Sequence, residues 1–161
     1  MFDYIRDPAE IHKRSFETVR AETDVSGLSA DEAALTVRLV HACGMPDIVR
    51  NLVFGPGALK VGRAALGEGA AILTDVEMVR HGIIRARLPA DNPVLCMLHD
   101  SGVKERAAEQ GTTRSAAAVD LWREGLEGSV VAIGNAPTAL FRLLEVLDEV
   151  NKNVLGGVSA A

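Results

Sequence analysis

The segment from Gly128 to Leu140 constrains the fold more than any other part of the chain. Residues 129–133 form a short run rich in β-branched and apolar residues, which is typical of a strand covered on both faces, as in a parallel sheet. Gly134 indicates a turn, and Pro137 fits the first turn of a following helix, where its missing N–H needs no partner. We therefore expect a buried strand that leads directly into a helix.

The loop between this strand and helix is a candidate ligand site. Gly134, Asn135, Ala136 and Thr138 lie at the carboxyl end of the strand and the amino end of the helix, where backbone N–H groups can face a ligand. Asn135 or Thr138 can instead cap the helix. A tight turn without a ligand explains the same composition, so both interpretations stay open.

The rest of the chain alternates between the two kinds of secondary structure. Short apolar runs predict further strands at 52–54, 71–74 and 94–98. Caps, glycines and apolar periodicity predict helices at 7–22, 30–43, 58–66, 103–110, 112–125 and 136–150. This order predicts an α/β fold in a single domain, with a mostly parallel sheet and helices on both faces.

Composition narrows the classes of partner. The chain has 17 Lys and Arg against 22 Asp and Glu, a net charge of -5 and no basic block, which argues against a nucleic-acid partner. No apolar run approaches the roughly 18 residues of a membrane span, and residues 1–7 do not resemble a signal peptide. Cys43 and Cys96 are expected to be small buried thiols in a reducing compartment, so we expect a cytoplasmic protein.

His41 is the candidate acid. It lies in the last turn of the 30–43 helix, whose apolar residues predict burial nearly all round. The helix dipole favours the charged imidazolium, whereas burial favours the neutral ring. A general acid at neutral pH must adopt both forms, and this balance makes His41 the candidate. A buried histidine bonded to a backbone carbonyl is the alternative. The four histidines show no HxH or HExxH pattern, so we expect no metal.

Three arginines are candidates for binding an anion. Arg114 lies at a helix start, where the dipole disfavours positive charge and a ligand carboxylate would stabilise it, although an internal Asp or Glu is an equal alternative. Thr113 and Ser115 beside it are expected to cap that helix. Arg85 and Arg87 point to the same side if their segment is extended, which gives a small positive patch or a solvated surface.

Two further polar side chains have local interpretations. Ser15 is the single hydroxyl on the apolar stripe of the 7–22 helix, where a serine commonly bonds back to its own helix. Asp75 follows the strand at 71–74 and is expected to cap a short helix.

Several long motifs occur in order along the chain: 3–7 (DYIRD), 14–16 (RSF), 40–44 (VHACG), 75–79 (DVEMV), 81–89 (HGIIRARLP), 113–117 (TRSAA) and 132–140 (AIGNAPTAL). Together they resemble the precorrin-8X methylmutase family, also called precorrin isomerases, of cobalamin biosynthesis. Several ordered motifs are far more specific than any single cluster.

The resemblance implies an acid-assisted shift of a methyl group from carbon 11 to carbon 12 of a corrin precursor, which converts precorrin-8X to hydrogenobyrinic acid. It also implies an α/β homodimer without a metal or organic cofactor, in which His41 protonates the macrocycle. Substrate carboxylates would bind first to Arg114 and the 134–138 loop, and then to Ser15, Thr113, Ser115, Arg85 and Arg87. The alternatives are a corrinoid-binding protein without turnover and a methylmutase for cobalt-precorrin-8.

Residues 151–161 depart from the family pattern and are expected to form a short divergent tail after a domain at 1–150. Family members usually continue after the 136–150 helix with a Pro- and Gly-rich strand and a basic Arg-Gly-Arg segment. Here Gly156-Gly157 and Ser159-Ala160 resemble only the final motif. We therefore expect one edge of the sheet to be uncovered.

Overall fold

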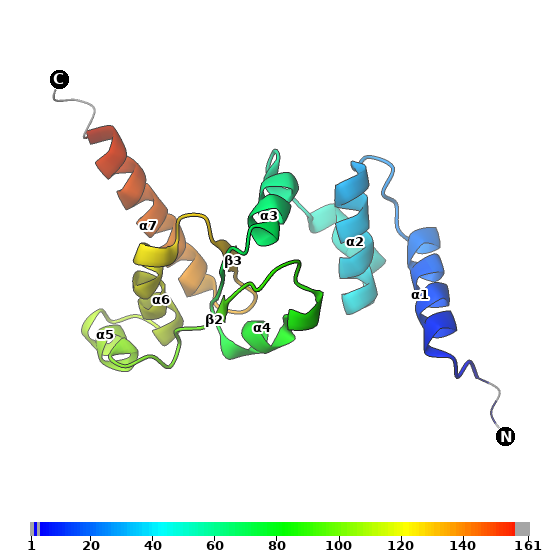
Figure 1. The fold of residues 1–161 in the computed structure, drawn as a ribbon, viewed down its shortest axis with the longest axis horizontal. Helices are drawn as coiled ribbons and strands as arrows, with labels where there is room; N and C mark the ends of the chain where they lie inside the picture. Colours follow the sequence, from blue (N-terminus) through cyan, green and yellow to red (C-terminus); the bar gives the residue numbers. More distant parts are fainter. Residues whose placement is uncertain (1, 3, 157–161) are drawn as a thin grey trace. The chain divides into compact units, whose positions relative to one another are not determined.

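The computed structural model describes residues 2 and 4–156, and it divides the chain into two compact units, Met1–Val61 and Gly62–Ala161 (Figure 1). The first unit pairs helix α1 (Pro8–Glu22) with helix α2 (Ala30–Cys43), and a 3₁₀ helix, η1 (Pro46–Asn51), follows. Local capping defines both α-helices. The Asp7 side chain accepts the Ala9 N–H at 2.8 Å, and Ser29 and Glu32 form a capping box.

The expected strand at 52–54 is wrong. The Leu52 N–H bonds back to the Val49 carbonyl at 3.2 Å, which closes the 3₁₀ helix instead of pairing with a sheet. Val53 is 93% exposed, so the apolar run does not reach a core. A run of three apolar residues is too short to specify a strand when no neighbouring strand is available to pair with it.

Helix α2 is also less buried than expected. Only Thr36, Val37 and Val40 are buried, whereas His41 and Cys43 are exposed. Within the first unit, α2 packs mainly against α1 and η1, and these contacts bury only a few of its side chains. The expectation that both thiols are buried is therefore wrong for Cys43, and Cys96 is half-buried.

The second unit contains a parallel sheet of three strands, β1 (Ile72–Thr74), β2 (Val94–Leu95) and β3 (Val130–Ala132). The strand order is β2-β1-β3, and Ile72 of the central strand lies beside Val94 on one side and Val130 on the other. The α/β class and parallel pairing are confirmed. The strands are shorter than expected, and β3 is a half-buried edge strand rather than one covered on both faces.

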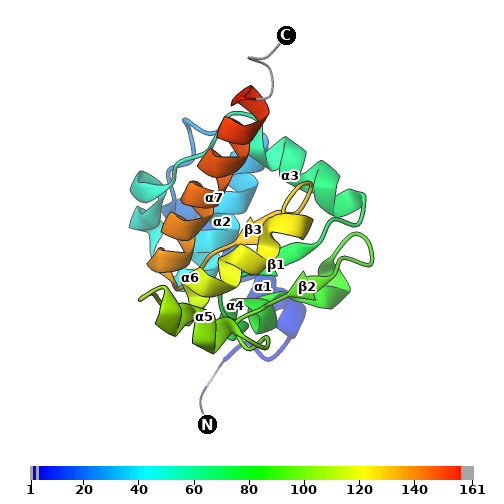
Figure 2. The same cartoon turned by 90° about the vertical axis from the view of Figure 1, so that its left-hand side faces the viewer.

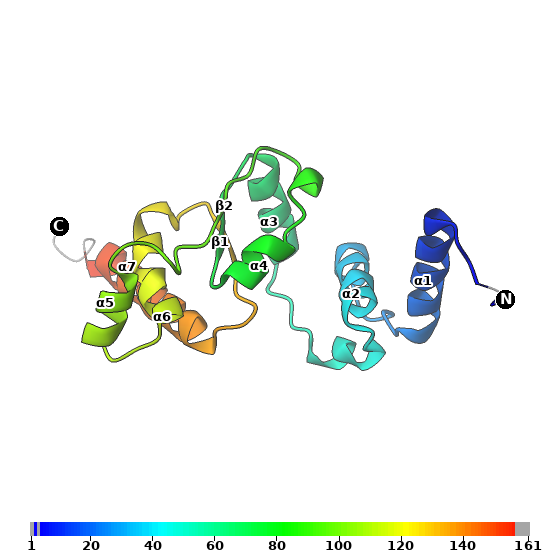
Figure 3. The ribbon, with the colours of Figure 1, turned by 90° about the horizontal axis from the view of Figure 1, so that it is seen from below.

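Helices lie on both sides of these strands. Figures 1 and 3 show α6 (Arg114–Val119) and α7 (Pro137–Gly156) on one side and α4 (Glu77–Gly82) on the other. The remaining elements are listed here by their bounds: α3 (Ala58–Gly67), η2 (Arg85–Arg87), α5 (Val103–Glu109) and η3 (Asp120–Gly125). No helix in the described part of the chain has the length and apolar character that crossing a membrane requires.

Helix α7 continues beyond its expected end at Val150 to Gly156, so the first part of the expected tail is helical. Residues 157–161 lie outside the described residues. Figure 2 looks onto α5, α6 and α7, which pack beside one another. Beneath α7 lies the main core, in which Trp122 is 1% exposed and packs with buried side chains of β1, α6 and α7, namely Leu73, Val119, Ala139, Leu143 and Val146.

An ion network ties η3 to α7. Arg142 donates to Asp120 Oδ1 from Nε at 2.9 Å, and its Nη1 donates to Glu145 at 2.7 Å. Gln110 donates to the other Asp120 oxygen at 3.0 Å. Burial raises the pKa of Asp120, but the hydrogen bonds from Gln110 and Arg142 outweigh this effect, and the pKa lies below its ordinary value of 3.8. The charged carboxylate therefore stabilises the folded chain.

We expect Asp120→Asn to lower the free energy of unfolding by about 1–2 kcal/mol at pH 7, because a charged acceptor that is 8% exposed is lost. A carboxyl with a depressed pKa stabilises the folded state above its ordinary pKa and loses that effect as the pH falls through the folded value. Urea unfolding at several pH values should show the difference shrinking below about pH 4. Glu127→Gln, at an exposed carboxylate, is the control and should change nothing.

Candidate functional site

His41 is held by consecutive residues of α1, within the first unit. Ser15 Oγ lies 2.9 Å from His41 Nδ1, and the Phe16 ring stacks on the imidazole with centroids 4.5 Å apart and planes inclined by 29°. The two contacts define both the position of Nδ1 and the plane of the ring. His41 Nε2 has no hydrogen-bond partner among the described residues, so this nitrogen is available to a ligand.

A second imidazole belongs to this cluster. His12 stacks on Phe16 at 4.4 Å, and its centroid lies 6.0 Å from that of His41. Sequence analysis missed both His12 and Phe16, although their four-residue spacing, with Ser15 at the intervening i+3 position, places all three side chains near one face of α1. Ser15 does not bond back to its own helix as its local interpretation suggested. Its hydroxyl instead contacts the candidate acid.

The backbone donors of the 134–136 loop are not free, as the sequence analysis had expected them to be, because a side chain of the protein accepts them. The N–H groups of Gly134, Asn135 and Ala136 donate to the Asp75 carboxylate at 3.3, 3.0 and 2.7 Å. Asp75 was expected to cap a short helix, but α4 has Val76 at its N-cap and no side-chain cap. Three donors from the facing loop provide a better environment for a buried carboxylate than one helix end does.

The starts of α6 and α7 meet through two hydroxyl groups. Thr113 caps α6 by accepting the Ala116 N–H at 3.2 Å, as expected, and its Oγ1 lies 2.7 Å from Thr138 Oγ1. Arg114 is the exposed first residue of α6, and its side chain makes no ion pair or hydrogen bond with a described residue. The internal Asp or Glu partner left open by the sequence is therefore not found, and half-buried Ser115 follows.

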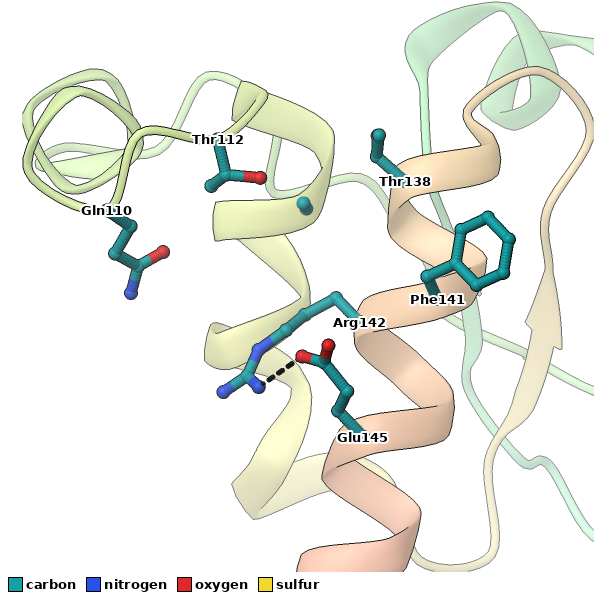
Figure 4. A pocket seen from close by; sticks show the side chains of 7 residues that line it. Gln110, Thr112, Thr138, Phe141, Arg142 and Glu145 are labelled. Atoms are coloured by element: carbon teal, nitrogen blue, oxygen red, sulfur yellow. Dashed lines mark hydrogen bonds and ion pairs between the residues drawn. The ribbon is translucent and has the colours of Figure 1, made fainter.

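A cavity of about 420 Å³ adjoins these helix starts. Figure 4 shows Thr112 and Thr138 at one end and Arg142 with Glu145 at the other. The Arg142 guanidinium is already bonded to Asp120, Glu145 and Glu149, so it offers little to a further carboxylate. Of the two arginines considered for this region, Arg114 therefore has the unpaired guanidinium, but Arg114 is not among the residues that line the cavity.

Arg85 and Arg87 do not form the expected patch. Both belong to the 3₁₀ helix η2, where residues two apart diverge around the axis instead of sharing one side. Both side chains are exposed, and Arg85 Nη2 donates to the Val94 carbonyl at 3.3 Å. The prediction failed because it assumed extended backbone. In the described part of the chain, no three His, Cys, Asp or Glu side chains form a group that could hold a metal ion.

Comparison with known proteins places this geometry in context. The family model described as precorrin-8X methylmutase matches residues 10–156. The precorrin-8X methylmutase of Pseudomonas aeruginosa is 58% identical over 148 residues, which are 92% of this chain and 71% of that protein. The enzyme of the same name from a Sinorhizobium species is 59% identical over 146 residues, covering 91% of this chain and 70% of the relative.

More distant relatives and a solved structure agree. A cobalt-precorrin-8 methylmutase of Methanothermobacter thermautotrophicus is 36% identical over 140 residues, 85% of this chain and 64% of that one. The crystal structure of a precorrin-8x methyl mutase from Thermus thermophilus matches with a TM-score of 0.77 and 34% identity, covering 88% of this chain and 69% of that chain. On these grounds, the chain belongs to the precorrin-8X methylmutase family.

Proposed function

We propose that this protein converts precorrin-8X to hydrogenobyrinic acid by moving a methyl group from carbon 11 to carbon 12 of the ring, with His41 as the proton donor. The observation that carries the proposal is the His41 imidazole fixed by Ser15 and Phe16 with Nε2 left open. The two relatives that are 58% and 59% identical are named for the metal-free substrate, which favours precorrin-8X over its cobalt form.

The contacts of His41 suit a group that gives up and regains one proton. In the imidazolium, Nδ1–H donates to Ser15 Oγ, and loss of the Nε2 proton leaves that hydrogen bond unchanged. The stacked Phe16 ring fixes the plane of the imidazole. Proton transfer to the macrocycle withdraws electron density from its conjugated system, which lowers the barrier to methyl migration.

Carboxylates on the rim of the substrate need donors outside the His41 cluster. Arg114 supplies an unpaired guanidinium at the start of α6, where free backbone N–H groups add to the positive field. Thr113 immediately precedes Arg114, and its hydroxyl contacts that of Thr138. Ser115 follows Arg114, and Asn135 lies three residues before Thr138. Gly134 and Ala136 contribute to substrate binding only through the backbone conformation of the loop. Arg85 and Arg87 are secondary candidates for binding a substrate carboxylate.

We further infer a homodimer in the cytoplasm. Helix α7 exposes Leu140, Leu144 and Leu147 by 44%, 54% and 41%, a stripe that a second copy would bury. The free cysteines are compatible with a reducing compartment.

Sedimentation equilibrium should give twice the chain mass for the parent protein and the mass of one chain for Leu144→Glu. A parent protein that sediments as one chain would overturn the dimer.

His41→Ala should reduce conversion at least about 100-fold, because the proton donor is lost, while binding of the product is retained. Absorption spectroscopy of the protein incubated with precorrin-8X follows the reaction directly, since the product has a different conjugated chromophore. His99→Ala, at an exposed histidine of the second unit, is the matched control and should convert normally. If the parent protein only shifts the spectrum of added hydrogenobyrinic acid without conversion, the chain is a binding protein.

Arg114→Gln should raise KM about 10- to 100-fold with a smaller change in kcat, because a charged hydrogen bond to a substrate carboxylate is lost. Steady-state kinetics measures both constants. Lys104→Gln removes an exposed charge from neighbouring α5 and provides the comparison. An equal rise in KM for both variants would assign the effect to overall charge, not to Arg114.

A further inference from the structure

The Asp75 carboxylate is the most completely enclosed charge near the proposed substrate-binding loop. Its residue is 1% exposed, and its two oxygens accept the three N–H groups of residues 134–136. The structure gives it no Lys, Arg or His partner within the described residues. A buried charge without a counterion is expensive unless hydrogen bonds satisfy it, so these three bonds are a strong constraint on the loop.

We propose that Asp75 is a positioning residue for substrate binding, which holds the 134–138 loop in the shape that presents Thr138 to the substrate. This inference rests on the function proposed above. The shortest of the three bonds, at 2.7 Å, comes from Ala136, immediately before the first residue of α7. The carboxylate thus lies at the positive end of a long helix, where a negative charge is favoured, and it sets where that helix begins.

A series of contacts links Asp75 to Arg114. Thr138 is the second residue of α7, and its hydroxyl lies 2.7 Å from that of Thr113, the cap residue that immediately precedes Arg114. The loop also passes close to α4, because a Cβ added at Gly134 would lie 2.7 Å from Val79 Cγ2. The loop is therefore constrained by its bonds to Asp75 and by its close approach to α4, and a shift at its start would move Thr138 away from Thr113.

The same geometry decides how the loop can recognise an anion. Because Asp75 occupies the N–H groups of residues 134–136, a substrate carboxylate cannot use them without displacing a buried charge. Recognition falls to the side chains of Thr138 and Arg114. Asp75 acts through the loop and touches no substrate atom.

The test compares Asp75→Asn with Thr74→Val. The first variant keeps the side-chain shape but replaces an acceptor oxygen with an NH₂ group that faces N–H donors. The second changes the preceding residue, which is also 1% exposed and donates one hydrogen bond to the Leu95 carbonyl at 3.0 Å. We expect Asp75→Asn to raise KM about tenfold or more with kcat changed less than about threefold. Thr74→Val should lose stability without changing KM.

Two further measurements separate positioning from general loss of structure. Thr138→Val should raise KM by itself, and adding it to Asp75→Asn should cause little additional change, because both act through one contact. Amide hydrogen exchange needs no substrate: Asp75→Asn should speed exchange in residues 134–140, and Thr74→Val should not. Equal KM changes in both variants, or unaltered exchange in Asp75→Asn, would overturn the proposal. Lack of conversion by the parent protein would instead contradict the proposed function, and exchange would still test the role of Asp75.

Discussion

The second unit depends on one buried carboxylate. Asp75 follows the central strand β1 and binds the loop that leaves the neighbouring strand β3, so a single side chain joins two parallel strands to the start of α7. The sheet itself has only short strands and few backbone hydrogen bonds to hold its edge. Because an unsatisfied carboxylate in this position would be costly, the strand ends, the loop and the helix are coupled and must form together.

The proposed proton donor is built differently, on the surface of a helix pair. His41 is exposed, and its orientation comes from Ser15 and Phe16, which lie across the α1–α2 contact. This arrangement leaves one ring nitrogen accessible while the other stays bonded. A fully buried imidazole, as the apolar sequence of α2 suggested, would be unable to reach a large macrocycle. Exposure therefore suits the proposed chemistry better than the expected burial does.

Whether a prediction succeeded depended on how far apart in the sequence the interacting residues lie. The helix starts that Asp7, Ser29 and Thr113 cap were predictable, because each of these side chains accepts a hydrogen bond from a backbone N–H two or three residues away. The strand at 52–54 failed because no strand in the described part of the chain pairs with it, although Leu52 itself has an extended backbone. The shared side of Arg85 and Arg87 failed because their segment is a 3₁₀ helix and not extended. Asp75 was expected to cap the helix that follows it, whereas its hydrogen-bond partners lie about 60 residues away.

By itself, the sequence determined the α/β class, the bounds of most helices and, through ordered motifs, the family, because capping, periodicity and motif identity are local properties. It also offered His41 and Arg114 as candidate site residues, and their roles stay a proposal. Only the tertiary structure decided which groups surround them. The contact of Ser15 with His41, the bond between Thr113 and Thr138, and the occupation of the loop donors by Asp75 each join residues 25 or more positions apart. Such pairings depend on how the elements pack, which no local pattern encodes.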